Sequence, residues 1–130
     1  MAKKILVIDD DESLVTYLKA LLEDNGYEVI TAKDGKEGME KTKNEKPDII
    51  TLDLLMPEKT GIKMFHELRK DEKMRNIPII VITGISDQYQ AFSDFKKFIY
   101  ERKVPGPEAY IEKPIKPDEL LSKIDEILKK

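Results

Sequence analysis

The sequence predicts an α/β fold in which helices cover both faces of a parallel sheet. Two observations support this prediction. Short apolar runs rich in β-branched residues recur along the chain, without the polar alternation of a half-exposed strand. Segments with a helical spacing of apolar residues lie between these runs, so strand and helix alternate five times. This order favours parallel strands joined by right-handed crossovers.

The first half of the chain holds three predicted strands and two predicted helices. The strands are ILVI (5–8), the weaker EVIT (28–31) and DIITL (48–52). Residues 12–25 place leucines and a valine on one face, and Gly26 follows where a helix C-cap is expected. Residues 35–45 form a shorter and more polar helix that carries Met39.

The second half continues the alternation. The remaining strands are PIIVI (78–82) and AYI (109–111), and the remaining helices are 61–71, 86–103 and 117–129. The helix at 86–103 is long and ends before Pro105-Gly106-Pro107. The last helix has a clear apolar face, and Pro117 suits its first turn.

Length and composition exclude several classes of protein. The 130 residues fit one domain, which we place at residues 1–130. The chain has no cysteine, so disulfides, thiol catalysis and zinc–thiolate sites are excluded. Its net charge of −3 argues against nucleic acid as a partner. We find neither a signal peptide nor an apolar run that could span a membrane, so we expect a cytoplasmic protein without a membrane partner.

Polar and charged residues follow four of the predicted strands. They are Asp9-Asp10-Asp11-Glu12, Asp53, Thr83-Gly84 and Glu112-Lys113-Pro114. The carboxyl ends of parallel strands meet at one edge of a sheet, so these groups are expected to converge. Crowded carboxylates repel one another unless a cation neutralises them, and hard oxygen ligands favour Mg²⁺. A lysine and a hydroxyl nearby suit a phosphoryl group, with Asp53 as its nucleophile.

Each of these residues also has a simpler interpretation. The acids at 9–11 are suited to capping the helix that follows them. Lys113 can be a solvated lysine beside a turn, and Thr83 an ordinary hydroxyl at the end of a strand. The simpler interpretation is the better one for each residue alone. Their joint occurrence at four consecutive strand ends favours a functional site.

The stretches ILVIDDDES, IITLDLLMPEKTG, IIVITG and AYIEKPI, in this order, resemble the receiver domains of bacterial two-component response regulators. The resemblance, which is to the chemotaxis-regulator-like members, runs from about residue 3 to the end of the chain. It implies a flavodoxin-like sheet of five parallel strands in the order 2-1-3-4-5, flanked by five helices.

The resemblance also implies a role for each candidate residue. Asp53 matches the phosphoacceptor, Asp10 a direct Mg²⁺ ligand and Asp9 an acid that orients metal-bound water; Mn²⁺ is an alternative metal. The Leu55 carbonyl matches a further metal ligand. Thr83 and Gly84 match the residues that bind the phosphoryl group, and Lys113, which is expected to have a cis bond to Pro114, matches the lysine that pairs with it. Thr83 also matches the switch hydroxyl, and Tyr110 matches the aromatic switch residue.

The expected function is a phosphorylation-activated signalling switch and not a multiple-turnover enzyme. The resemblance implies that a histidine kinase or phosphotransfer protein supplies the phosphoryl group. It also implies that the fourth helix, fifth strand and fifth helix signal to a downstream protein. Slow self-dephosphorylation is expected, because the apolar Leu55 and Ile85 stand where side chains border the path of the attacking water.

The segment between Thr83 and Lys113 departs from the family pattern. Its 29 residues exceed the number expected, so we predict a lengthened fourth helix or loop at about 86–108. The aromatic residues at 86–108 are Tyr89, Phe92, Phe95, Phe98 and Tyr100. They suggest either a wider buried stripe or a docking or homodimer surface, and exposure of Phe98 and Tyr100 would favour the surface.

Three alternatives remain open. One is a metal-dependent phosphatase that works through an aspartyl phosphate, because Asp9 and Asp11 form an Asp-x-Asp pattern; the cap domain that such enzymes need is missing. Another is a nucleotide or flavin binder, which would require a glycine-rich loop where this chain has acids. A third is a receiver that signals through protein contacts without being phosphorylated.

Overall fold

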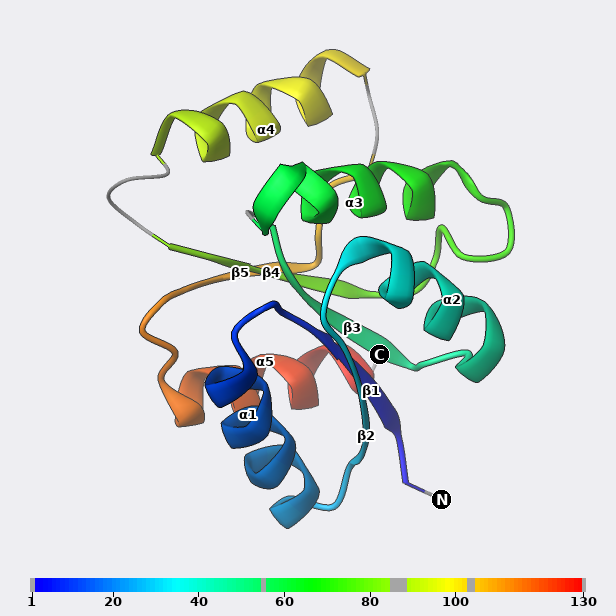
Figure 1. The fold of residues 1–130 in the computed structure, drawn as a ribbon. Helices are drawn as coiled ribbons and strands as arrows, with labels where there is room; N and C mark the ends of the chain where they lie inside the picture. Colours follow the sequence, from blue (N-terminus) through cyan, green and yellow to red (C-terminus); the bar gives the residue numbers. More distant parts are fainter. Residues whose placement is uncertain (1, 55, 85–88, 103–104, 130) are drawn as a thin grey trace.

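The computed structural model describes residues 2–54, 56–84, 89–102 and 105–129. Five parallel strands form one sheet in the order β2-β1-β3-β4-β5, as predicted (Figure 1). The strands are β1 (Lys4–Ile8), β2 (Glu28–Ala32), β3 (Ile49–Asp53), β4 (Ile79–Thr83) and β5 (Ala109–Glu112). The helices are α1 (Glu12–Asp24), α2 (Gly35–Glu45), α3 (Thr60–Lys70), α4 (Tyr89–Arg102) and α5 (Pro117–Leu128).

The helices cover both faces of the sheet, which explains why the strands read as continuous apolar runs. Ile5 and Val7 of β1 point to the face covered by α1 and α5, where Leu18 and Leu120 are buried. The alternate residues of β1 point to the opposite face, which α2, α3 and α4 cover (Figure 1). Strands β1 to β4 therefore bury side chains in both cores, whereas β5 buries only Ile111, in the core under α1 and α5. The sequence prediction of a doubly covered sheet is confirmed.

Local signals in the sequence account for the ends of the first helix. The carboxylate of Asp11 caps α1 by accepting a hydrogen bond from the amide of Leu14 at 3.2 Å. Gly26 lies just beyond the other end of α1 and has a φ of +89°, which glycine adopts without steric cost. The capping interpretation is therefore correct for Asp11, although not for the acids that precede it.

The chain differs from the predicted elements between β3 and α3. A short 3-10 turn, η1 (Pro57–Lys59), precedes α3 and was not predicted. Within it Glu58 has a φ of 61°, so the turn cannot continue directly into the α-helix. A second difference is that Asp53 is the last residue of β3, paired with Ile82, and does not follow the strand.

The first and last described residues, 2 and 129, lie at the edge of the sheet where the strands begin. β1 enters the sheet at this edge, and α5 runs back to it from the carboxyl end of β5 (Figure 1). Asp9 and Asp53 lie at the other edge, where the strands end. In the part of the chain that the structure describes, no helix combines the length and apolar character needed to cross a membrane.

Candidate functional site

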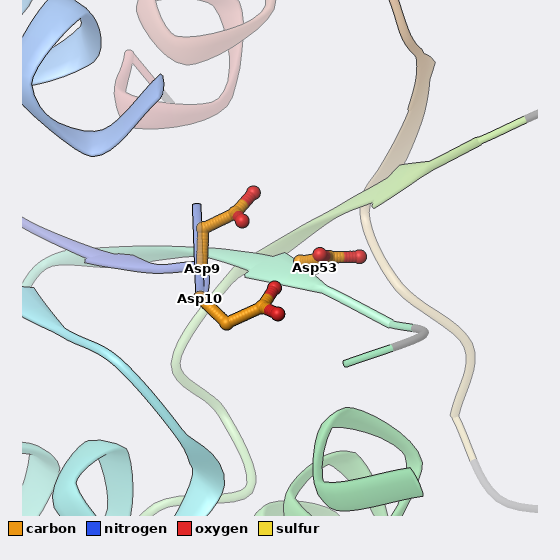
Figure 2. Close-up of side chains that lie close together, drawn as sticks. All are labelled: Asp9, Asp10 and Asp53. Carbon is orange, nitrogen blue, oxygen red and sulfur yellow. The ribbon is translucent and has the colours of Figure 1, made fainter. Parts of the chain in front are cut away.

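Three aspartates meet at the carboxyl edge of the sheet. β1 and β3 are neighbours, so Asp9 and Asp10, which follow β1, lie beside Asp53 at the end of β3 (Figure 2). One carboxylate oxygen from each residue lies within 4.8 Å of the others. Asp9 and Asp53 are 2% and 6% exposed, whereas Asp10 is exposed. The cluster thus has a buried floor and one side open to solvent.

Lys113 faces the buried floor of this cluster from the end of β5. Its Nζ lies 3.3 Å from Asp9 Oδ2 and donates a hydrogen bond to Asp53 Oδ2 at 3.4 Å. The simpler interpretation of Lys113 as a solvated lysine is therefore wrong. One ammonium faces three carboxylates, so the cluster keeps a negative balance that favours a further cation.

The environment shifts the pKa of two of these groups. Burial raises the pKa of the Asp9 carboxyl to about 6, with help from the Asp53 carboxylate and against the opposing effect of the Asp11 amide, whose hydrogen bond it accepts at 2.9 Å. For Lys113, burial lowers the pKa, but the carboxylates of Asp53 and Asp9 raise it more strongly. The net pKa of Lys113 is therefore raised, and its ammonium stays charged at neutral pH.

The residues present fit a magnesium ion. Asp9 Oδ2 is buried and makes no hydrogen bond to any residue that the structure describes; Lys113 lies within ion-pair distance of it. A carboxylate oxygen in this condition is ready to accept a cation or water that a cation holds. The donors are all carboxylate oxygens, which Mg²⁺ prefers, and the open side at Asp10 leaves room for its waters. An acidic triad of this kind is typical of a Mg²⁺ site.

The raised pKa of Asp9 predicts a pH-dependent metal affinity. Protons and Mg²⁺ compete for this carboxylate, so below its pKa of about 6 the affinity should fall by about tenfold per pH unit. Above that pKa Asp9 is already ionised, and the affinity should level off. Calorimetric titration of Mg²⁺ at several pH values checks this. In Asp9→Asn the affinity should be lower and this slope lost, and a wild-type affinity that is constant from about pH 5 to pH 7 would contradict the assignment.

Thr83 and Lys113 are held side by side at the ends of β4 and β5. The amide of Lys113 donates a hydrogen bond to the Thr83 carbonyl at 2.7 Å, and Thr83 is buried. Gly84 is half-buried directly after Thr83, and the Lys113–Pro114 peptide bond is cis. Outside the acid cluster, a hollow of about 560 Å³ borders these residues; its lining includes Thr83, Lys96, Tyr110, Lys113, Lys116 and Lys123.

Tyr110 lies on β5 in the wall of this hollow. It is 39% exposed, and the ammonium of Lys96 on α4 lies 5.5 Å from the centre of its ring. Partial burial raises the pKa of the Tyr110 hydroxyl, so the ring stays neutral. The ring is thus half-exposed in this structure and lies beneath a charged residue of α4.

The sequence prediction missed two residues that shape the site. One is Lys96, whose charge is common on a helix surface and gave no signal. The other is Gly61 in α3, where a Cβ would lie 2.3 Å from the Asp53 carbonyl oxygen and 2.5 Å from that of Leu54. A glycine at the first position of a predicted helix was the available signal for this close approach. Two predicted residues, Leu55 and Ile85, lie outside the described residues.

Comparison with known proteins identifies relatives of the whole chain. The response regulator receiver domain family matches residues 5–125. The alkaline phosphatase synthesis transcriptional regulatory protein PhoP of Bacillus subtilis (strain 168) is 38% identical over 130 residues, which are 100% of this chain and 50% of that protein. The polar-differentiation response regulator DivK of Brucella ovis is 31% identical over 115 residues, 88% of this chain and 87% of that protein. The chain spans about half the length of the transcriptional regulators among these relatives.

Solved structures share the fold over their full length. A response regulator receiver domain protein (CheY-like) from Methanospirillum hungatei JF-1 superposes with a TM-score of 0.82 at 31% identity, covering 99% of this chain and 95% of that one. A response regulator from Chloroflexus aurantiacus J-10-fl, described as putative, superposes with a TM-score of 0.84 at 26% identity, covering 100% of both chains.

Proposed function

The chain belongs to the response regulator receiver domain family of two-component systems, and from this premise we propose that it is a signalling switch controlled by phosphorylation of Asp53. Receiver domains typically act as switches rather than as enzymes, and they partner with histidine kinases. The observation that carries the proposal is the position of Asp53 beside both the acids that follow β1 and the ammonium of Lys113. That arrangement provides a nucleophile, a place for a cation and a counter-charge for a phosphoryl group.

The proposed chemistry is a single displacement at phosphorus. A carboxylate oxygen of Asp53 attacks the phosphoryl group of a phosphohistidine on the partner protein. The new O–P bond forms while the N–P bond breaks, and the departing imidazole takes up a proton. The product is an aspartyl phosphate, which water slowly hydrolyses to restore Asp53. Such a transfer depends chiefly on positioning and on charge neutralisation.

Each residue of the site would have a separate role in the phosphoryl transfer. Lys113 already contacts Asp53 at 3.4 Å and would pair with an oxygen of the transferred phosphoryl group. The buried hydroxyl of Thr83, with the adjacent Gly84, would bind another oxygen. Asp9 and Asp10 would hold Mg²⁺, which when bound neutralises charge on the phosphoryl oxygens; Mn²⁺ would serve as a substitute. The Leu55 carbonyl, as a further metal ligand, remains part of this proposal.

The proposed readout is the face formed by α4, β5 and α5. The hollow lined by Lys96, Tyr110 and Lys123 lies on this face, directly beyond Thr83. A movement of Thr83 toward a phosphoryl group would leave space for the Tyr110 ring to turn inward. That movement would alter the surface that a downstream protein contacts.

We retain the docking or homodimer surface on α4 as part of the proposal. Tyr100 is 84% exposed, which supports a contact surface over a wider buried stripe at this position. Phe95 is 2% exposed and belongs to the core, while Phe98 lies outside the described side chains. The lengthened segment at 86–108 would then extend the readout face.

The structure favours a switch over the phosphatase alternative at one residue. In an Asp-x-Asp phosphatase the second acid must be available for proton transfer. Here the carboxylate of Asp11 accepts the amide hydrogen of Leu14 as the cap of α1, at 3.2 Å. This contact gives Asp11 a structural role as the cap of α1, which supports the switch over the phosphatase pattern at this residue.

The direct test is incubation of the protein with acetyl phosphate, with and without Mg²⁺, followed by intact mass measurement. We expect one phosphoryl adduct that requires Mg²⁺ and is lost on base treatment, as an acyl phosphate would be. Absence of an adduct is followed by a binding assay with beryllofluoride, which does not depend on the phosphodonor. Failure of both would refute the proposed switch and leave a receiver that acts through contacts alone.

A further inference from the structure

A buried arginine connects three segments of the chain. Arg69 lies in the last turns of α3, and its side chain is 1% exposed. Its Nη1 donates hydrogen bonds to the carbonyls of Arg75 at 2.8 Å and Ile77 at 3.1 Å, which lie in the turn before β4. A buried guanidinium is costly unless its donors are satisfied, so these contacts need to be complete.

The remaining donors of Arg69 reach the segment after α4. Nε donates to the carbonyl of Pro105 at 3.2 Å, and Nη2 donates to the carbonyl of Gly106 at 3.1 Å and to Glu108 Oε1 at 2.9 Å. Glu108 Oε1 also accepts the amide hydrogen of Ile79 at 2.7 Å, which fixes it to β4. All five donors of the guanidinium are therefore used, and three of them hold residues 105–108.

The same arginine also supports the buried side of α4. Its guanidinium lies over the ring of Phe65, with 5.1 Å between Cζ and the ring centre. Phe65 packs edge-on against Phe95, the buried aromatic of α4, with 5.1 Å between ring centres and 80° between planes. The next turn of α4 places Ile99 against the core, near Gly106. One side chain thus contacts the segment after α4 directly and reaches the helix itself through an aromatic pair.

We propose that Arg69 is the positioning residue for α4, and therefore for the exposed face of α4 that carries Lys96 and Tyr100. Pro105 follows the end of α4 by three residues, so its fixed carbonyl confines that end to within about 10 Å. Switching would then displace α4 about this anchored end. The significance for signalling rests on the proposed function, whereas the anchoring itself does not require phosphorylation.

Amide hydrogen exchange distinguishes an anchor for α4 from a residue that only contributes to the stability of the whole protein. Loss of general stability raises exchange of amide hydrogens throughout the protein, because all protected amides then open through global unfolding. Loss of an anchor raises exchange mainly in the segments that were held. These segments are α4 and residues 105–112. The reference segments are β1 and β3, neither of which supplies a hydrogen-bond acceptor to Arg69.

Hydrogen exchange followed by mass spectrometry of unphosphorylated Arg69→Met tests the proposal. We expect at least a roughly tenfold acceleration in α4 and residues 105–112, and less than about threefold in β1 and β3. Arg75→Met is the matched control, since the Arg75 side chain is exposed and only its main-chain carbonyl contacts Arg69. This control should leave exchange in α4 unchanged.

Arg69→Lys provides a second test of the proposal in case the Arg69→Met protein does not fold. Lysine keeps the charge beside Glu108 but has no planar fork to reach both main-chain segments, so it should give a smaller acceleration in the same segments. Uniform acceleration, or none in α4, would overturn the proposal in either variant. Modification of Asp53 by acetyl phosphate should stay within about twofold of wild type in the folded variants, because no partner of Arg69 belongs to the acid cluster. If the Arg69 variants exchange as expected while the wild type neither forms an adduct nor binds beryllofluoride, the switch is refuted and the anchor stands.

Discussion

Replacing Asp53 with Asn is expected to abolish the phosphoryl adduct formed with acetyl phosphate and Mg²⁺. The amide of Asn is a poor nucleophile, and it removes one of the three carboxylates that would hold the cation. The expected loss is complete within detection, because the proposal assigns the phosphoryl group to Asp53 alone, and the acids beside it are assigned to the cation. Intact mass measurement on wild type and variant under the same conditions gives the result directly.

Asp11→Asn is the matched control for this experiment. It removes a neighbouring carboxylate by the same chemical change, and Asn caps a helix about as well as Asp does, so α1 should be unaffected. We expect an adduct yield close to wild type. An adduct that persists in Asp53→Asn would move the acceptor to another residue. A large loss in Asp11→Asn would instead favour the phosphatase pattern, in which Asp11 takes part in chemistry.

Gly61→Ala is expected to destabilise the protein strongly, although helix propensity alone predicts the reverse. Alanine is favoured over glycine inside a helix by about 1 kcal/mol. The added Cβ would, however, lie 2.3 Å from the carbonyl oxygen of Asp53 and 2.5 Å from that of Leu54. These are main-chain atoms at the end of β3, so relief requires a shift of α3 or of the strand. Overpacking of this kind costs about 1–3 kcal/mol, and rigid backbone neighbours place the expected loss near the upper end.

Thermal unfolding of Gly61→Ala should show a Tm lowered by roughly 10 °C for a loss of about 3 kcal/mol. Mg²⁺ binding should weaken as well, because the displaced carbonyl belongs to Asp53 itself. Gly106→Ala is the control, since its Cβ would meet nothing closer than the Ile99 side chain at 3.9 Å. That variant should keep its stability or gain slightly. A Gly61→Ala protein as stable as wild type would mean that α3 is not tightly packed against the end of β3.

The order of elements was predictable from sequence because both cores draw on the same strands. Burial of Ile5 and Leu6 on opposite faces removes polar residues from β1, and that pattern is visible without a structure. The acid cluster was predictable for a related reason. Once the strands are parallel and alternate with helices, Asp9 and Asp53 must lie at the same edge of the sheet.

Other features depend on contacts that no local pattern records. Lys113 is 60 positions from Asp53, and nothing in the residues around either of them fixes their separation of 3.4 Å. Four of the five acceptors of Arg69 are main-chain carbonyls, which have no sequence signature. The positive φ of Glu58 likewise follows from how the chain must turn between β3 and α3. Such features are set by the completed fold.

The placement of the chain ends at the edge where the strands begin has a practical consequence. Any polypeptide joined to either end would emerge on the far side of the sheet from Asp53. Under the proposed function, a partner that delivers a phosphoryl group would approach at the opposite edge of the sheet, away from the point of attachment. A fluorescent protein, a surface tag or a second folded unit can therefore be fused to either end without covering the edge of the sheet that holds Asp53. Biosensors built on it should place their reporters at these ends and sense changes through α4 and β5.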